Sequence, residues 1–284
     1  MRWSNNIRNE FLNSNILYKL IYINIGIYLI LEITKVILNI FLIDINFNTN
    51  KLILLSDTSK LISQPWSLLT YIFFHDNIFH LLFTIIWLHF GGKLFLQYFS
   101  EKQFITTYIL GGISGGLLFI LSINYLPSIE LLHQNQRLGP LMGSSGAVLA
   151  ILFAVTTHIP NYNLKIPLMG FIRIKYIAYI LLLLSFLGID GSNSGGNLAH
   201  IGGAVFGFLY IKLLTKTKRS NTNNNSFIKY LINIFTSLKP KSSEKENKNN
   251  NQKEIDIVLE KISKSGYDSL NKDEKDLLFK ASKK

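Results

Sequence analysis

The sequence predicts an all-α protein: a polytopic membrane bundle of six transmembrane helices with a small helical tail in the cytoplasm. The first observation is composition, because 48% of the 284 residues are hydrophobic although the C-terminal end is polar and rich in lysine. The second is that the apolar residues form separate stretches, most of them close to the length that crosses a bilayer. These spans cover residues 17–43, 78–98, 104–126, 142–159, 174–189 and 199–215.

The alternation of polar and apolar segments divides the chain into four parts. They are an N-terminus (1–16), the membrane domain (17–215), a basic linker (216–252) and a C-terminal helical hairpin (253–284). The first span is too long for a signal-peptide core and lacks a small-residue cleavage site, so we expect it to stay as an anchor. In the hairpin, Asn271 followed by Glu274 is typical of an N-cap and its capping-box acid. The chain has no cysteine, which excludes disulfides and thiolate chemistry.

Basic residues set the expected orientation. If the N-terminus is cytoplasmic, the loops on that side carry Lys102, Lys165, Arg173 and Lys175, and the outer loops carry balanced charge. Cytoplasmic loops are enriched in Lys and Arg, so we expect both termini in the cytoplasm and a multi-pass protein of the cell inner (plasma) membrane. The chain after residue 215 has 16 basic and 9 acidic residues, which fits this side. It lacks a basic motif interleaved with aromatic residues, so we expect no nucleic acid as a partner.

Two charged residues interrupt the first span. Glu32 and Lys35 are three residues apart, which places both on one face of a helix. Charges within a membrane span are costly unless they are paired. We therefore expect the two side chains to pair with each other and to face protein.

Polar residues gather at the start of three alternate spans. In the expected orientation, spans two, four and six all begin at the outer face and run inward. The second opens with His75, His80 and Thr84, the fourth with the segment GSSG (143–146), and the sixth with His200. Unrelated packing motifs have no reason to coincide at one depth, so we expect a shared site just below the outer surface.

A serine and a histidine at one depth are typical of a nucleophile and its base. A neutral imidazole accepts the hydroxyl proton as the serine attacks a carbonyl, and then passes it to the leaving amine. N–H groups at the start of the fourth helix are suitable donors for the oxyanion. Small residues on spans four and six permit a close approach of the two helices: Gly146, Ala150, Gly203 and Gly207. Two other interpretations stay open: the small residues serve packing alone, or His80 and Thr84 line a path for protons or ions.

Three motifs together resemble the rhomboid intramembrane serine proteases. They are HDNIFHLLF (75–83), GSSG (143–146) and AHIGG (199–203), which occur in the order and on the spans that this family has. The resemblance covers residues 15–215, the six-helix body. The terminal hairpin is also similar to a tail found on some bacterial rhomboids.

The resemblance implies a catalytic dyad that uses no aspartate, no metal and no cofactor. Ser145 matches the nucleophile and His200 the general base. His80 matches a donor of the oxyanion hole, assisted by the backbone N–H of Ser145, and His75 matches a second histidine that orders this region. The implied partners are single-span transmembrane proteins, which are cut as substrates near the outer interface of the lipid bilayer.

The resemblance also implies a substrate gate. Phe83 and Trp87 match the gating side of span two, which faces span five (174–189). Substrates would enter between these two helices, beneath a flexible cap formed by GSNSGGN (191–197).

Three positions depart from the family pattern. Thr84 stands where an asparagine usually contributes to the oxyanion hole, and its hydroxyl is shorter than an amide arm. Leu149 replaces an aromatic residue that supports the histidine ring, and Ser67 replaces a frequent arginine. The alternative function is a catalytically weak or inactive rhomboid-like protein that binds transmembrane helices without cutting them. A transporter is a more distant alternative, because the span centres lack a substantial ionisable network.

Overall fold

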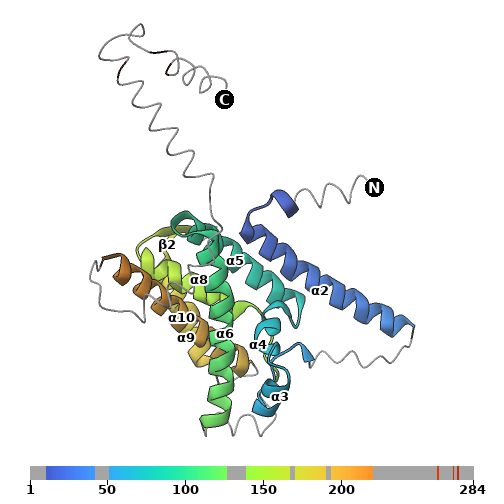
Figure 1. Cartoon of the computed structure of the whole chain (residues 1–284). Coiled ribbons are helices and arrows are strands. Elements are labelled where there is room, and N and C mark those ends of the chain that lie inside the picture. Colours follow the sequence, from blue (N-terminus) through green and yellow to red (C-terminus); the bar gives the residue numbers. More distant parts are fainter. Residues whose placement is uncertain are drawn as a thin grey trace. The chain divides into compact units, whose positions relative to one another are not determined.

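The computed structural model describes residues 11–41, 51–126, 139–166, 170–189 and 193–219, together with Lys261, Asn271 and Glu274 (Figure 1). The chain forms two compact units, Met1–Lys229 and Tyr230–Lys284. In the first unit, six apolar helices correspond to the six predicted spans. They are α2 (Ile16–Ile40), α5 (Ile78–Tyr98), α6 (Glu101–Tyr125), α8 (Ser145–His158), α9 (Ile174–Leu187) and α10 (Ser194–Arg219).

Length separates these helices into two groups. Four are long and apolar enough to cross a membrane: α2, α5, α6 and the part of α10 from Ser194 to Thr215. The helices α8 and α9 are apolar but have only 14 residues each. The chain is thus a multi-pass membrane protein built as a bundle of helices.

Local capping explains where three of the helices begin. Asn15 and Asn77 accept hydrogen bonds from backbone N–H groups in the first turns of α2 and α5. Ser100 forms a capping box with Gln103 at the start of α6. These side chains satisfy N–H groups that a helix leaves unpaired. Between α2 and α5, the elements with described bounds are the short helices α3 (Thr58–Ser63), α4 (Ser67–Thr70) and η2 (Tyr71–Phe73).

The described residues of the second unit contain the predicted capping box. The N–H of Asn271 donates to the Glu274 carboxylate, and the N–H of Glu274 donates to Asn271 Oδ1, both at 2.8 Å. Lys261 forms an ion pair with the same carboxylate at 2.8 Å. The rest of the predicted hairpin and the linker beyond residue 219 lie outside the described residues.

A β-hairpin departs from the expected all-α fold. It joins α8 to α9 and consists of β1 (Asn163–Ile166) and β2 (Gly170–Arg173), which pair antiparallel with Asn163 opposite Arg173. Strands of four residues give too short a pattern to be recognised beside long apolar spans.

The start of α10 also differs from the expectation. This helix begins at Ser194, five residues before the predicted span, so residues 194–197 form its first turn. The expectation of a flexible cap is therefore wrong for these four residues. Asn197 explains the difference, because its side chain donates to the Gly188 carbonyl at 2.7 Å and its N–H donates to the Asn193 carbonyl at 3.0 Å. The first bond ties the glycine-rich start of α10 to the end of α9, and the second closes the first turn of α10.

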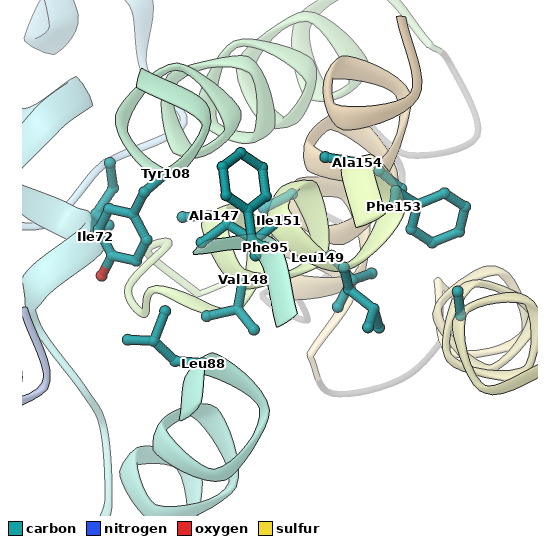
Figure 2. Packing of buried hydrophobic residues seen from close by; sticks show 14 of the residues in the cluster. Ile72, Leu88, Phe95, Tyr108, Ala147, Val148, Leu149, Ile151, Phe153 and Ala154 are labelled. Carbon is teal, nitrogen blue, oxygen red and sulfur yellow. The ribbon is translucent and has the colours of Figure 1, made fainter. Parts of the chain in front are cut away.

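The central helix of the first unit is α8 (Figure 2). All of its residues from Gly146 to Thr156 are buried, and it packs against α10, α6 and α5. A helix that is apolar on every side belongs in the interior of a bundle. Leu88 and Phe95 of α5 and Tyr108 of α6 belong to the buried cluster around it.

Small residues bring α8 against α10, as the sequence predicts. A methyl group on Gly203 would collide with the Gly146 carbonyl, and one on Gly207 would collide with the Ala150 carbonyl. Gly146 also lies against Ala199, since a Cβ at Gly146 would be 2.8 Å from the Ala199 carbonyl oxygen. The two backbones are therefore in direct contact.

Only the first half of α2 is packed on the bundle. Its buried residues are Leu17, Ile21 and Asn24. Glu32 and Lys35 form the predicted ion pair, with 2.7 Å between Lys35 Nζ and Glu32 Oε1. Their side chains are 36% and 53% exposed, respectively, so the pair lies on the surface of the first unit. The expectation that this pair faces protein is therefore wrong.

Candidate active site

The candidate nucleophile, Ser145, is the first residue of α8, and the turn before it requires glycine. Gly143 has a φ of +118°, a conformation that residues with a side chain rarely adopt. Its N–H donates to the Tyr71 carbonyl at 3.0 Å. Leu141 and Leu54 exchange two backbone hydrogen bonds, at 2.8 and 3.0 Å. The segment before α5 thus holds the turn that presents Ser145.

The helix α8, which begins with Ser145, is shorter than the hydrocarbon core of a bilayer is thick. Its 14 residues span about 21 Å, roughly 9 Å less than a hydrocarbon core of about 30 Å.

His200 faces Ser145 across the contact between α8 and α10. The distance from His200 Nε2 to Ser145 Oγ is 2.7 Å, which is a short hydrogen bond. The adjacent residues, Ala199 and Gly146, make one of the close backbone contacts between these helices. An imidazole at this distance accepts the hydroxyl proton when its Nε2 is unprotonated.

The second ring nitrogen of His200 has a partner that the sequence analysis missed. Ser185 of α9 is buried, and its Oγ is 3.0 Å from His200 Nδ1. Ser185 is the polar residue within the apolar run LLLLSFL. Polar side chains in membrane spans are candidates for function, and that signal was available for this serine as well.

His80 and His75 both lie beside the turn that precedes α8. The ring of His80 packs against Gly143, where a Cβ would be 2.6 Å from His80 Cε1. The two histidine rings make an edge contact with centroids 5.4 Å apart. Burial, with a smaller contribution from the neighbouring His80, lowers the pKa of His75 to about 4, so His75 is neutral at neutral pH.

Ser144 has different partners from Ser145. Its side chain is buried, and its Oγ is 3.2 Å from His75 Nε2. It also interacts with the hydroxyl of Tyr108, which accepts a hydrogen bond from the Asn24 side chain at 3.3 Å. This buried polar chain connects α2 and α6 to the turn before α8.

Hydrogen-bond donors without described partners occur at the start of α8 and within α5. The side chain of Ser144, the N-cap residue of α8, accepts no hydrogen bond from the backbone of this helix. The first N–H groups of α8 therefore have no capping side chain. Thr84 is buried, and its hydroxyl has no hydrogen-bond partner among the described residues. A buried donor without a partner costs about 1–3 kcal/mol. Both features provide hydrogen-bonding capacity for a bound oxygen atom.

A cavity of about 500 Å³ borders His80. Polar side chains of Asp76, Asn77 and Asn193 line it, together with residues 139–142. These residues come from the starts of α5 and α10 and from the segment before α8. A polar lining of this kind suits water.

Of the two predicted gate residues on α5, Phe83 is exposed, whereas Trp87 is partly buried against the hydrophobic core. Phe83 is 55% exposed, and its ring centroid is 6.0 Å from that of Trp87. The helix α5 packs on α8, α2 and α6, whereas α9 packs on α10 and α8. The helices α5 and α9 therefore flank the central helix without extensive contact with each other. Of the two other departures from the family pattern, Leu149 is buried in the core and Ser67 begins α4.

Comparison with known families agrees with the motifs. The family model of the rhomboid domain matches residues 63–217, more than half of the chain. The chain belongs to the rhomboid family. Its helix bundle is consequently a rhomboid domain. Rhomboids are a family of intramembrane protease-like proteins. Residues 244–284 match a second family, DUF6576, whose function is unknown.

This rhomboid is also similar to curated animal proteins. The "Presenilin-associated rhomboid-like protein, mitochondrial" of Mus musculus and that of Homo sapiens are each 28% identical to it over 156 residues, which is 54% of this chain and 38% of the relative. "Presenilin-associated rhomboid-like protein A, mitochondrial" of Danio rerio is 30% identical over 143 residues, which is 49% of this chain and 35% of the relative. The chain thus spans little more than a third of the length of these relatives.

Proposed function

We propose that this rhomboid is an intramembrane serine endopeptidase that cleaves transmembrane segments of membrane proteins with Ser145 and His200. The observation that carries the proposal is the 2.7 Å distance between His200 Nε2 and Ser145 Oγ. Membership of a protease-like membrane family supports the same function.

The reaction we propose has two steps. Ser145 Oγ attacks the carbonyl carbon of the scissile peptide while His200 Nε2 takes its proton, and the imidazolium gives that proton to the leaving amine. Water then attacks the acyl ester on Ser145 while His200 takes a proton from it, and the imidazolium returns this proton to Ser145 Oγ as the second product leaves. The cavity lined by Asp76, Asn77 and His80 supports the supply of water on the His80 side of the site.

We assign the oxyanion hole to the start of α8, with His80 and Thr84 as side-chain donors. The N–H of Ser145 is in the first turn, which lacks a side-chain cap, and the hydroxyl of Thr84 is buried without a described partner. Donors aimed at the charge of the transition state are valuable: the loss of one costs about 2.7–4 kcal/mol in a soluble serine protease. His75 supports His80 through the contact of their rings.

The substrates we propose are single-span transmembrane proteins that reach the site from the bilayer. The limited contact between α5 and α9 and the exposed ring of Phe83, beside Trp87, support access on this side. A substrate must unwind locally at the cut, because the amide of a regular helix is shielded from attack.

We also propose that residues 17–215 form a six-span membrane domain with both termini in the cytoplasm. The basic residues in the loops support this orientation. The plasma membrane is our expectation for the location, whereas the names of the curated relatives place those proteins in mitochondria.

Labelling with a fluorophosphonate probe in detergent tests the proposed function. The wild type should be labelled at Ser145, and both Ser145→Ala and His200→Ala should lose the label. The same preparations are mixed with a purified single-span substrate, and cleavage should follow labelling. A folded wild type that is neither labelled nor able to cut would contradict the proposal.

A catalytically weak or inactive rhomboid that binds transmembrane helices is the second candidate function. Thr84 favours it, since its hydroxyl is a shorter donor than the asparagine usual in the family. This candidate predicts a wild type that binds a transmembrane peptide but leaves the peptide and the probe unchanged.

A further inference from the structure

Ser185 is the residue of α9 that reaches the candidate dyad. Its Oγ is 3.0 Å from His200 Nδ1 and 2.8 Å from the carbonyl oxygen of Leu181. The side chain is only 3% exposed, so water does not compete for these contacts. His200 therefore has a serine at each ring nitrogen, with Ser145 at Nε2 and Ser185 at Nδ1.

The hydroxyl of Ser185 has a single proton, and the place of this proton decides the tautomer of His200. A carbonyl oxygen only accepts, so the hydroxyl donates in its contact with Leu181. The Ser185 oxygen is then an acceptor toward His200, which requires a proton on Nδ1. A neutral ring with its proton on Nδ1 has its lone pair on Nε2, the atom that faces Ser145.

The opposite arrangement would disable the base. If Ser185 donated to Nδ1, the proton of the neutral ring would be on Nε2 and would point at Ser145. Such a ring has no lone pair for the Ser145 proton, and the Leu181 carbonyl would lose its hydroxyl bond. Serines in helices commonly donate to the carbonyl four residues earlier. The arrangement in which Ser185 donates to Leu181 and accepts from His200 therefore needs no unusual geometry.

We propose that Ser185 is a positioning residue that holds His200 in the Nδ1–H tautomer required of a general base. The proposal rests on the proposed function, because it assigns a role to the partner of the dyad. Soluble serine proteases use a buried aspartate for this task. A hydroxyl selects the same tautomer without placing a permanent charge in the membrane, where charges are costly.

The test compares three variants of the full-length protein in detergent: Ser185→Ala, Ser185→Thr and Thr157→Ala. Thr157 is the matched control, because its hydroxyl also donates to the carbonyl four residues earlier, that of Phe153 at 2.7 Å. Ring tautomers are read by 15N NMR of labelled histidines, and the His200 signals are identified by their loss in His200→Gln. Both kcat and KM are measured with a single-span substrate.

In the wild type we expect His200 as the Nδ1–H tautomer. Ser185→Ala should convert part of the population to Nε2–H and lower kcat about five- to tenfold, the effect of one ordinary hydrogen bond, with KM unchanged within about twofold. Ser185→Thr retains the hydroxyl and should restore the tautomer, with kcat within about twofold of the wild type. Thr157→Ala should match the wild type in both measurements.

An Nε2–H tautomer in the wild type would overturn the proposal, and this result does not depend on the folding of any variant. An unchanged tautomer in Ser185→Ala, or a kcat that Ser185→Thr fails to restore, would also overturn it. Failure of the proposed function is a different result. The wild type would then neither cut a substrate nor accept a probe on Ser145, while NMR would still show which nitrogen of His200 carries the proton.

Discussion

Replacing Gly146 by alanine should separate the two helices that carry the dyad. A Cβ at this position would be 2.8 Å from the Ala199 carbonyl oxygen, whereas ordinary contacts begin near 3.4 Å. The helices α8 and α10 must therefore move apart by about 0.6 Å at this point. Gly146 follows Ser145 and Ala199 precedes His200, so the movement lengthens the 2.7 Å hydrogen bond between the two side chains.

The substitution should affect activity more than stability. Alanine is a better helix former than glycine by about 1 kcal/mol, which offsets part of an overpacking cost of roughly 1–3 kcal/mol. A misplacement of about 1 Å costs roughly a hundredfold in rate, so a shift of about 0.6 Å should lower kcat by about tenfold or more. We therefore expect Gly146→Ala to be folded, with a melting temperature near that of the wild type, and to be slow.

Gly91→Ala is the matched control for this experiment. A Cβ at Gly91 would be 3.6 Å from Ile151 Cγ2, an ordinary contact between α5 and α8. The wild type and both variants are compared by the rate of fluorophosphonate labelling at Ser145 and by thermal unfolding in detergent. Labelling of Gly146→Ala at the wild-type rate would refute the idea that this backbone contact sets the distance within the dyad.

Three further predictions test the site and the topology. Ser145→Ala should abolish cleavage whereas Ser144→Ala should retain it, and the reverse result would exchange their roles. Thr84→Asn should raise kcat several-fold with little change in KM and Thr84→Val should lower it, because an oxyanion donor acts mainly on the charge formed in the transition state. If both variants cut at the wild-type rate, Thr84 is a packing residue. A reporter fused after residue 60 should be external and one fused after residue 225 internal, and an external signal at 225 would contradict the topology.

The membrane helices can be predicted from the sequence because the bilayer fixes their length and polarity. The predicted second span and α5 share the same ends, residues 78 and 98, and Asn77 caps the helix at its start. The contact between α8 and α10 also follows from the sequence, since Gly146 and Gly203 leave no side chain between the backbones. The start of α10 does not follow, because hydropathy indicates where lipid contact begins and Ser194 starts the helix before that point.

Ser185 shows why the rest of the site is harder to predict. A serine in a helix satisfies its own hydroxyl on the carbonyl four residues earlier, so its presence in an apolar run demands no further partner. The partner it has, His200, is on a different helix, and only the packing of α9 on α10 brings them together. The same limit applies to Glu32 and Lys35. Their spacing shows that they share one face of a helix, but it does not show whether that face contacts the rest of the protein.

The neutral character of the candidate dyad affects the whole proposed reaction. Both hydrogen-bond partners of His200 are serines, so the resting site needs no charge within the membrane. When Ser145 transfers its proton, the imidazolium and the oxyanion form together, and the site as a whole stays neutral. A hydroxyl at Nδ1 stabilises the imidazolium less than a carboxylate does, since a hydrogen bond to a charged partner is stronger. The donors of the proposed oxyanion hole must then supply a larger share of the stabilisation. Of the three departures from the family pattern, we therefore expect Thr84, which stands in place of an asparagine, to have the greatest effect on rate.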